Sequence, residues 1–225
     1  LDTEVVGAAG PDAIELVTSL SILDQPFLAD SAFGSSPVSL ADSTLRGLPL
    51  MPAGMLAEVM AEAARKLEPA MVVVAVDGFS MPRWLTVEGS TRSIQIRARR
   101  LPGNAGGIIR FETTVLDRER ASETPASAAI LAQAFVSLAT DYAPPTQPPR
   151  VLALRGPVKL NWQSADIYPA RLHHGPAFQN LIGIPEWGEN GLVARWVTLP
   201  RGSLVRRTAT PRTVMACATT SSLET

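Results

Sequence analysis

The chain has 225 residues, of which 46% are hydrophobic and 18% are charged, and its formal net charge at pH 7 is −1. A chain of this length and composition buries a globular core, as one large domain or as two small ones. Its near-neutral charge gives no electrostatic basis for binding nucleic acid or an anionic membrane surface, so we expect neither partner.

The cysteine and histidine content narrows the class of protein further. Cys217 is the only cysteine, which excludes an internal disulfide framework and fits a reducing compartment. One thiol and two adjacent histidines also lead us to expect no metal site. No apolar run reaches the roughly 20 residues of a membrane span, and the first residues lack a secretory signal pattern. We therefore expect a soluble, cytoplasmic domain.

The N-terminal part of the chain has the weakest pattern. Residues 1–17 are small and mixed, and they predict no more than a short strand or turn. Residues 19–43 have extended character, which Pro26 and a Gly-Ser-Ser-Pro turn interrupt. The tetrapeptide Leu-Ala-Asp-Ser occurs twice in this segment, at 28–31 and at 40–43, but two such short copies do not define a repeat architecture.

The strongest helical pattern follows Pro52. Apolar residues from Met51 to Leu67 recur every three or four positions and form a broad stripe. Proline is favoured in the first turn of a helix, and Pro69 ends the pattern. Alanines occupy part of the opposite side, so we expect a helix that is buried on most sides.

Four strand-like segments come next, and their bounds are 71–76, 93–99, 108–116 and 128–139. The Pro-Gly-Asn-Ala-Gly-Gly sequence at 102–107 predicts a hairpin turn between the second and the third. A charged loop around residues 117–124 separates the third from the fourth. One strand, one buried helix and an antiparallel meander is the element order of an α+β hotdog fold, in which the sheet wraps the helix.

A proline-rich segment at 142–150 predicts a stiff linker between an N-terminal half, 1–141, and a C-terminal half, 151–225. Four features are expected in the C-terminal half, namely a turn at Gly156-Pro157, an irregular stretch containing Trp162 and Tyr168, a strand at 191–199 and a helix that starts near Pro211. We interpret this half as a second, incomplete copy of the same unit, in which the meander is truncated or partly missing.

Two motifs carry a family resemblance. Residues 43–52 read STLRGLPLMP and run into AGMLAEVMAEAA, and residues 174–179 read HGPAFQ. This chain resembles the dehydratase domains of polyketide synthases and fatty acid synthases, over roughly residues 20–220. The first motif is similar to their His-x-x-x-Gly-x-x-x-x-Pro signature, with Gly47 and Pro52 at the matching positions and Ser43 in place of the histidine. The second is similar to their Gly-Pro-x-Phe-Gln segment. The resemblance implies a double-hotdog fold.

The resemblance also implies where proton transfer would occur. The family histidine takes the α-proton of a β-hydroxyacyl thioester, and an aspartate from the second half protonates the departing hydroxyl. The aspartate position corresponds to Ala216 in this chain. A serine hydroxyl is no substitute for the histidine, because its pKa lies far above neutrality unless a partner activates it. Ser43 and Ala216 therefore mark catalytic positions that we expect to be inactive.

The remaining implications of the resemblance concern binding. Backbone amides near Gly47 and the start of the helix would polarise the thioester carbonyl. The residues expected to shape the substrate pocket are Gly47, Pro52, Gly54, His174, Gly175, Pro176 and Phe178. The substrate is expected on the phosphopantetheine arm of an acyl carrier protein, with no directly bound cofactor. Neighbouring synthase domains and a second copy of the chain are the other expected partners.

Three hypotheses of different kinds stay open. In the first, the chain is an active β-hydroxyacyl dehydratase, isomerase or cyclase. Its base was then replaced by engineering at Ser43, or the loss of that base is compensated, with His174 as a substitute base. Alternatively, it is a non-catalytic domain retained in a megasynthase for dimerisation, spacing or holding the growing chain. A stand-alone acyl-binding hotdog is the third, and the proline-rich linker between the halves argues against it. Arg206 and Arg207 are either a solvated loop or a contact with a carrier protein.

Overall fold

The computed structural model describes residues 3–7, 10–32, 47–87, 91–103, 106–120, 129–144, 153–172 and 174–197. The chain divides into two compact units. The first comprises Leu1–Asp24 and Leu50–Thr146, and the second comprises Gln25–Pro49 and Gln147–Thr225. Residues 25–49 thus group with the C-terminal part of the chain, an association across the sequence that no local pattern predicted.

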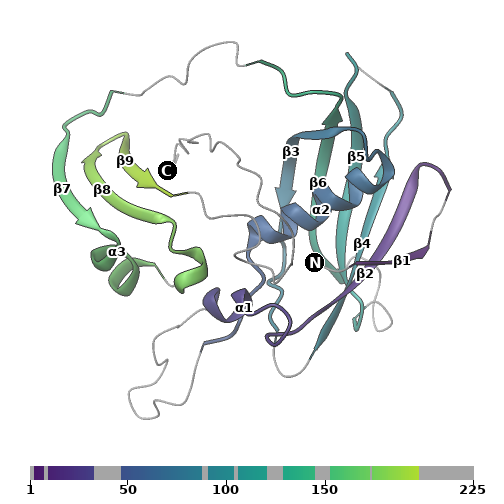
Figure 1. Cartoon of the computed structure of the whole chain (residues 1–225), viewed down its shortest axis with the longest axis horizontal. Helices are drawn as coiled ribbons and strands as arrows, with labels where there is room; N and C mark the ends of the chain where they lie inside the picture. The colour runs from purple at the N-terminus through teal and green to yellow at the C-terminus, as the bar shows by residue number, and fades with distance from the viewer. Residues whose placement is uncertain are drawn as a thin grey trace. The chain divides into compact units, whose positions relative to one another are not determined.

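The first unit is an antiparallel six-stranded sheet around one long helix, α2 (Figure 1). The strand order is β1-β2-β4-β5-β6-β3. The elements are β1 (Glu4–Gly7), β2 (Ala13–Leu20), α2 (Ala53–Leu67), β3 (Val72–Ser80), β4 (Arg92–Arg100), β5 (Ile109–Asp117) and β6 (Ile130–Ala139). Because α2 contacts every strand from β2 to β6, the sheet wraps the helix as the predicted hotdog fold requires.

The spacing of apolar residues along each element explains this packing. The described α2 side chains with the deepest burial are Leu56, Val59, Met60, Ala61, Ala63 and Ala64. In β4 the buried residues Ile94, Ile96 and Ala98 alternate with more exposed ones, which places one face of the strand against the core. The predicted helix and the predicted antiparallel meander are confirmed, including the hairpin between β4 and β5.

Two expectations for the first unit had the wrong extent. Residues 1–17 were expected to form no more than a short strand or turn, whereas they contain β1 and most of the eight-residue strand β2, which continues into the segment of extended character expected from residue 19. Its buried positions alternate, but the buried Thr18 interrupts the apolar pattern that would have revealed it. The segment expected at 71–76 extends to Ser80 as the edge strand β3, where Gly78 at φ 59° lies in a register shift.

The second unit contains a three-stranded antiparallel sheet of order β7-β8-β9. Its elements are α1 (Phe27–Asp30), β7 (Val158–Gln163), α3 (Ser164–Arg171), the 3₁₀ helix η2 (Pro176–Phe178), β8 (Leu181–Gly188) and β9 (Gly191–Trp196). The turn predicted at Gly156 is present, with that glycine at φ 56°. The strand predicted at 191–199 is present as β9. The helix expected near Pro211 lies outside the described residues.

Two further predictions in this unit need correction. The extended character expected after residue 19 gives way to α1, which begins directly after Pro26. The stretch with Trp162 and Tyr168 is regular rather than irregular, because it forms β7 and α3. Asn161, in the left-handed region at φ 53°, lies in a register shift of β7, so the alternation that identifies a strand is broken there. β8 was not predicted at all.

Candidate functional site

The motif residues Pro52 and Gly54 lie at the N-terminus of α2, in the first unit. Pro52 is the N-cap, with extended φ and ψ of −60° and 144°, and its carbonyl accepts the N–H groups of Met55 and Leu56. No described side chain caps this end, and the first turn holds no acidic residue. Ala53 and Gly54 are exposed. The first-turn N–H groups and the positive end of the helix dipole therefore face outward without an internal acceptor from a side chain.

Hydrogen bonds fix the segment that leads into α2. The N–H of Met51 donates to the carbonyl of Leu85 over 2.9 Å, and Leu50 forms an antiparallel bridge with Thr86. Arg92, at the start of β4, donates from Nη1 to the carbonyl of Thr86 over 2.9 Å. The entry to the helix is thus fastened to the strand β4.

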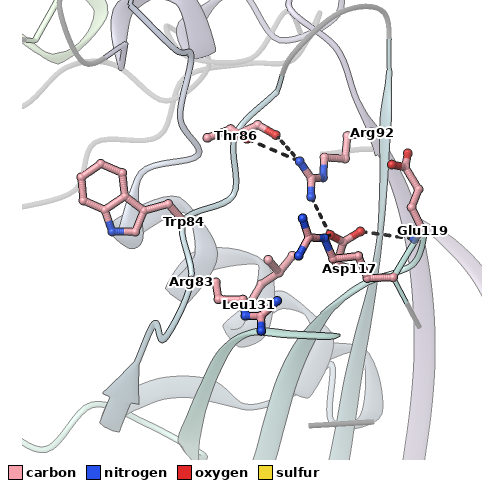
Figure 2. A pocket seen from close by; sticks show the side chains of 8 residues that line it. Arg83, Trp84, Thr86, Arg92, Asp117, Glu119 and Leu131 are labelled. Carbon is pink, nitrogen blue, oxygen red and sulfur yellow. Dashed lines mark hydrogen bonds and ion pairs between the residues drawn. The ribbon is translucent and has the colours of Figure 1, made fainter. Parts of the chain in front are cut away.

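The same arginine forms a buried ion pair. Nη2 of Arg92 lies 2.5 Å from Oδ2 of Asp117, the last residue of β5, and the Asp117 side chain is only 1% exposed. The other Asp117 oxygen, Oδ1, accepts the N–H of Glu119 over 3.2 Å. Figure 2 shows the Arg92 guanidinium between Thr86 and Asp117. This network forms one wall of a pocket of about 390 Å³, lined by Arg83, Trp84, Thr86, Arg92, Asp117, Glu119, Arg120 and Leu131.

In the second unit, the HGPAFQ motif is a tight turn held on α1. The N–H of Gly175 donates to the carbonyl of Asp30 over 2.7 Å, and the N–H of Ala177 donates to Oδ2 of the same residue over 2.9 Å. The rings of Phe27 and Phe178 meet edge to face, with centroids 6.1 Å apart. α1 therefore supplies both polar and aromatic contacts to the motif.

The ring of His174 lies against Phe178, with centroids 6.1 Å apart. Both side chains are partly exposed. Gln179 is exposed, and its Nε2 donates back to the carbonyl of His174 over 3.1 Å, which closes the turn on itself. The motif thus presents an imidazole and a phenyl ring together on a rigid backbone.

Asp30 and Phe27 are site residues that sequence reasoning missed. A signal for Asp30 existed, because it belongs to the first Leu-Ala-Asp-Ser copy at 28–31, whereas the similarity to the family signature begins in the second copy at 40–43. The first copy is the one that the structure places against HGPAFQ, and Ser31, which ends it, is 4% exposed.

The predicted site residues fall into three groups. Ser43 and Ala216 lie outside the described residues, as do His173, Arg206, Arg207 and Cys217. Pro52 and Gly54 lie together in the first unit. Gly47 belongs to the second unit, which also brings together His174, Gly175, Pro176 and Phe178.

The described residues contain neither a helix suited to crossing a membrane nor a cluster of side chains suited to holding a metal ion. None of the helices in the described ranges has the length and apolar character that crossing a bilayer requires. Three or more histidine, cysteine or acidic side chains do not gather anywhere in those ranges at a spacing suited to a metal ion.

Comparison with known proteins gives a likeness in three dimensions. No protein-family model matches the chain, and no curated protein matches its sequence significantly. A trans-AT polyketide synthase dehydratase domain from Brevibacillus brevis superimposes with a TM-score of 0.53 at 15% identity, over 86% of this chain and 66% of that one.

Two other solved structures are similar. An isomerase-inactive variant of GphF DH1 gives a TM-score of 0.52 at 17% identity, over 88% of this chain and 61% of its own. The dehydratase domain from the CurJ module of curacin polyketide synthase gives a TM-score of 0.51 at 17% identity, over 85% of this chain and 59% of its own. The chain spans less than two thirds of the length of each of the three. It has the hotdog fold of polyketide synthase dehydratase domains.

Proposed function

We propose that this chain is a dehydratase-like domain of a polyketide or fatty-acid megasynthase, which accommodates β-hydroxyacyl thioesters on a carrier protein and is impaired in dehydration or lacks it. The observation that carries the proposal is the N-terminus of α2, which no described side chain caps, at the end of a helix wrapped by an antiparallel sheet. The fold likeness to dehydratase domains supports the scaffold, and the two sequence motifs support the position of the site.

Dehydration requires three events at the substrate. A base removes the α-proton, the electron pair left behind forms the double bond between the α and β carbons, and the β-hydroxyl leaves as water after an acid protonates it. Negative charge develops on the thioester carbonyl oxygen as the α-proton leaves. The N–H groups of Ala53 and Gly54 would stabilise that oxygen, because they lie at the positive end of α2. This part of the site is made of backbone and does not depend on a catalytic side chain.

Proton transfer is the part that this sequence lacks under the proposed alignment. Ser43 stands where the family has its histidine, and Ala216 stands where it has its aspartate. Loss of a positioned base alone lowers the rate by about 10²–10⁴-fold. The domain would then retain the binding of an acyl thioester and lose most of the chemistry.

The test uses the chain as it stands and a β-hydroxyacyl N-acetylcysteamine thioester. We expect no dehydration by ultraviolet absorbance of the conjugated product, together with saturable binding of the unreactive, saturated analogue by calorimetry. Turnover by the unaltered chain would contradict the loss of catalysis and favour the alternative, an active dehydratase with a compensated base. Absence of binding would contradict the accommodation of an acyl thioester.

A double variant, Ser43→His with Ala216→Asp, tests the alignment itself. Restored dehydration is expected if the two positions are those of the family acid and base. The matched control is Ser31→His with Ala216→Asp, because Ser31 ends the other Leu-Ala-Asp-Ser copy. If only the control is active, the position of the family histidine corresponds to Ser31 and not to Ser43.

A further inference from the structure

The turn between β8 and β9 is fastened to residues 153–155, which precede β7 in the second unit. The side-chain amide of Asn190 donates from Nδ2 to the carbonyl of Ala153 over 3.1 Å, and its Oδ1 accepts the N–H of Arg155 over 2.8 Å. One amide thus bonds the chain on both sides of Leu154, much as the backbone of a neighbouring strand would. The N–H of Glu189 adds a bond of 3.0 Å to the carbonyl of Arg155. We call these three hydrogen bonds the Asn190 clip.

Two glycines enclose the turn that carries this clip, and each is required for a different reason. Gly188 ends β8 and is buried, and a Cβ there would lie 2.7 Å from the carbonyl oxygen of Arg155 and 3.0 Å from Cβ of Leu154. Gly191 begins β9 and has φ of 155°, which residues with a side chain rarely adopt. The close packing at Gly188 holds the clip together, and the backbone conformation at the start of β9 explains why a glycine directly follows Asn190.

The Asn190-Gly191 pair has a chemical consequence, because asparagine amides are among the thermolabile groups of proteins. The backbone nitrogen of the residue after an asparagine is the nucleophile that attacks the side-chain amide carbon. A glycine leaves that nitrogen unhindered, since it has no side chain. Asn190 is the only asparagine of the chain that a glycine follows, because alanine, tryptophan and leucine follow Asn104, Asn161 and Asn180. Asn190 is half-buried and Gly191 is exposed, so water reaches the pair.

We propose that Asn190 is a site of spontaneous deamidation, that the clip protects it, and that its modification detaches residues 153–155 from the turn. The nitrogen of Gly191 bonds to Cγ of Asn190 and loses its proton, and the bond from Cγ to Nδ2 breaks, so that ammonia leaves and a five-membered succinimide remains. Water then adds to either carbonyl of this ring and opens it. The products are aspartate and isoaspartate, and the only co-reactant consumed is water.

The clip sets the rate of this reaction and is itself destroyed by it. Both polar atoms of the Asn190 amide are held, so its carbon turns toward the nitrogen of Gly191 only after the bonds to Ala153 and Arg155 break. In the product, a carboxylate has no hydrogen to donate to the carbonyl of Ala153, and it places a negative charge beside that oxygen. Isoaspartate also adds one carbon to the backbone between Gly188 and Gly191, which are partners in the strand register. Deamidation therefore makes the opening of the clip irreversible.

The experiment follows deamidation of the full chain during incubation at mildly alkaline pH. Peptide mapping by mass spectrometry detects the mass increase at each asparagine, and an isoaspartyl methyltransferase assay detects the isoaspartyl product. We expect Asn190 to convert before the other three asparagines. Conversion should be about tenfold slower in the folded chain than in guanidinium chloride, because hydrogen bonds of ordinary strength have to break first. Equal rates would overturn the protection, and an unmodified Asn190 in the folded chain after complete conversion in denaturant would overturn the site.

Three variants separate opening of the clip from general loss of stability. Gly188→Ala should raise the rate at Asn190 about tenfold, because its Cβ displaces Leu154 and Arg155 from the turn and so breaks the protecting bonds. Gly183→Ala is the matched control, since its Cβ would lie 2.9 Å from the carbonyl oxygen of Trp162, between β7 and β8 and outside the clip. It should change the rate by less than about twofold. Asn190→Gln should abolish conversion at this position, because its longer side chain does not form the five-membered ring. Equal acceleration by both glycine variants would overturn the role of the clip.

Detachment of residues 153–155 has its own measurement. Asn190→Asp reproduces the aspartate product, and amide hydrogen exchange reports whether the remaining bond of the clip survives. The N–H of Glu189, which donates to the carbonyl of Arg155, should exchange about tenfold faster in this variant. The N–H of Val197, which donates to the carbonyl of Asn180 over 2.8 Å, lies outside the clip and should exchange as before. Unchanged exchange at Glu189 would overturn the detachment. None of these measurements involves an acyl thioester, so their outcome is independent of the proposed function.

Discussion

The carboxylate of Asp30 accepts the backbone N–H of Ala177 over 2.9 Å, although 147 positions separate the two residues in the chain. The carbonyl of Asp30 also accepts the N–H of Gly175, over 2.7 Å. One residue of α1 therefore holds two successive donors of the HGPAFQ turn. The conformation of that turn depends on a residue of the first Leu-Ala-Asp-Ser copy rather than on the motif alone.

Replacement of Asp30 by alanine should destabilise the second unit by about 1–3 kcal/mol, because the N–H of Ala177 loses its acceptor. Asp30→Asn, which keeps one acceptor oxygen, should reduce the stability of the second unit by a smaller amount. The measurement is urea unfolding followed by tryptophan fluorescence, since three of the four tryptophans, Trp162, Trp187 and Trp196, belong to the second unit. The control Asp77→Ala, at an exposed position of β3, should change stability by less than about 0.5 kcal/mol. Equal stability of the Asp30→Ala variant and the unaltered chain would refute the anchoring role.

Gly175 should tolerate no side chain. A Cβ at this position would lie 2.7 Å from Cγ and 2.8 Å from Cα of Asp30, closer than side-chain carbons approach. Gly175→Ala should therefore destabilise the second unit by about 1–3 kcal/mol through overpacking. Gly54→Ala is the contrasting variant, because a Cβ there meets nothing within 4 Å in the described part of its own unit. It should leave stability unchanged or raise it by up to about 1 kcal/mol, as alanine favours the helix. A neutral Gly175→Ala would show that α1 and the turn separate easily.

The regular spacing of apolar residues was sufficient to predict most of the helices and strands of the first unit. The stripe of α2 repeats every three to four residues, and β4 and β5 alternate, so each could be recognised within a single window of sequence. β2 has the same alternation of burial, but the buried Thr18 hides it in a pattern based on apolar residues. In β7, the left-handed Asn161 and a register shift remove the alternation itself.

The candidate sites required contacts that no local pattern encodes. The pairing of Asp30 with the HGPAFQ turn spans the chain, and a repeated tetrapeptide does not say which copy makes it. The pocket around Arg92 and Asp117 forms because β4 begins where β5 ends, which follows only from the strand register. The roles of Ser43 and Ala216 stay predictions, since both lie outside the described residues.

The core of the first unit gives a direct test of the wrapped-helix packing. The Leu56 side chain is fully buried in the interface of α2 with the sheet, so Leu56→Ala should destabilise the unit by about 2–5 kcal/mol. Glu58→Ala changes an exposed position of the same helix and should cost less than about 0.5 kcal/mol. Urea unfolding followed by far-ultraviolet circular dichroism measures both. Similar losses from the two variants would contradict the burial of this face of α2.

The last prediction compares two ion pairs of nearly equal length and opposite burial. Arg92–Asp117 has an N–O distance of 2.5 Å with side chains 19% and 1% exposed, whereas Arg99–Glu112 has 2.6 Å with 63% and 46%. Asp117→Asn should cost about 3–5 kcal/mol, because it leaves the Arg92 charge largely buried without a counter-charge. Glu112→Gln should cost no more than about 1 kcal/mol, because water already screens that pair.

Salt should distinguish the two pairs in the same urea-unfolding measurement. High concentrations of sodium chloride should reduce the small effect of Glu112→Gln and leave that of Asp117→Asn nearly unchanged, since mobile ions screen exposed charges far more than buried ones. If both variants cost the same, the Arg92–Asp117 pair would not be the rigid wall that fastens Thr86 and the entry to α2.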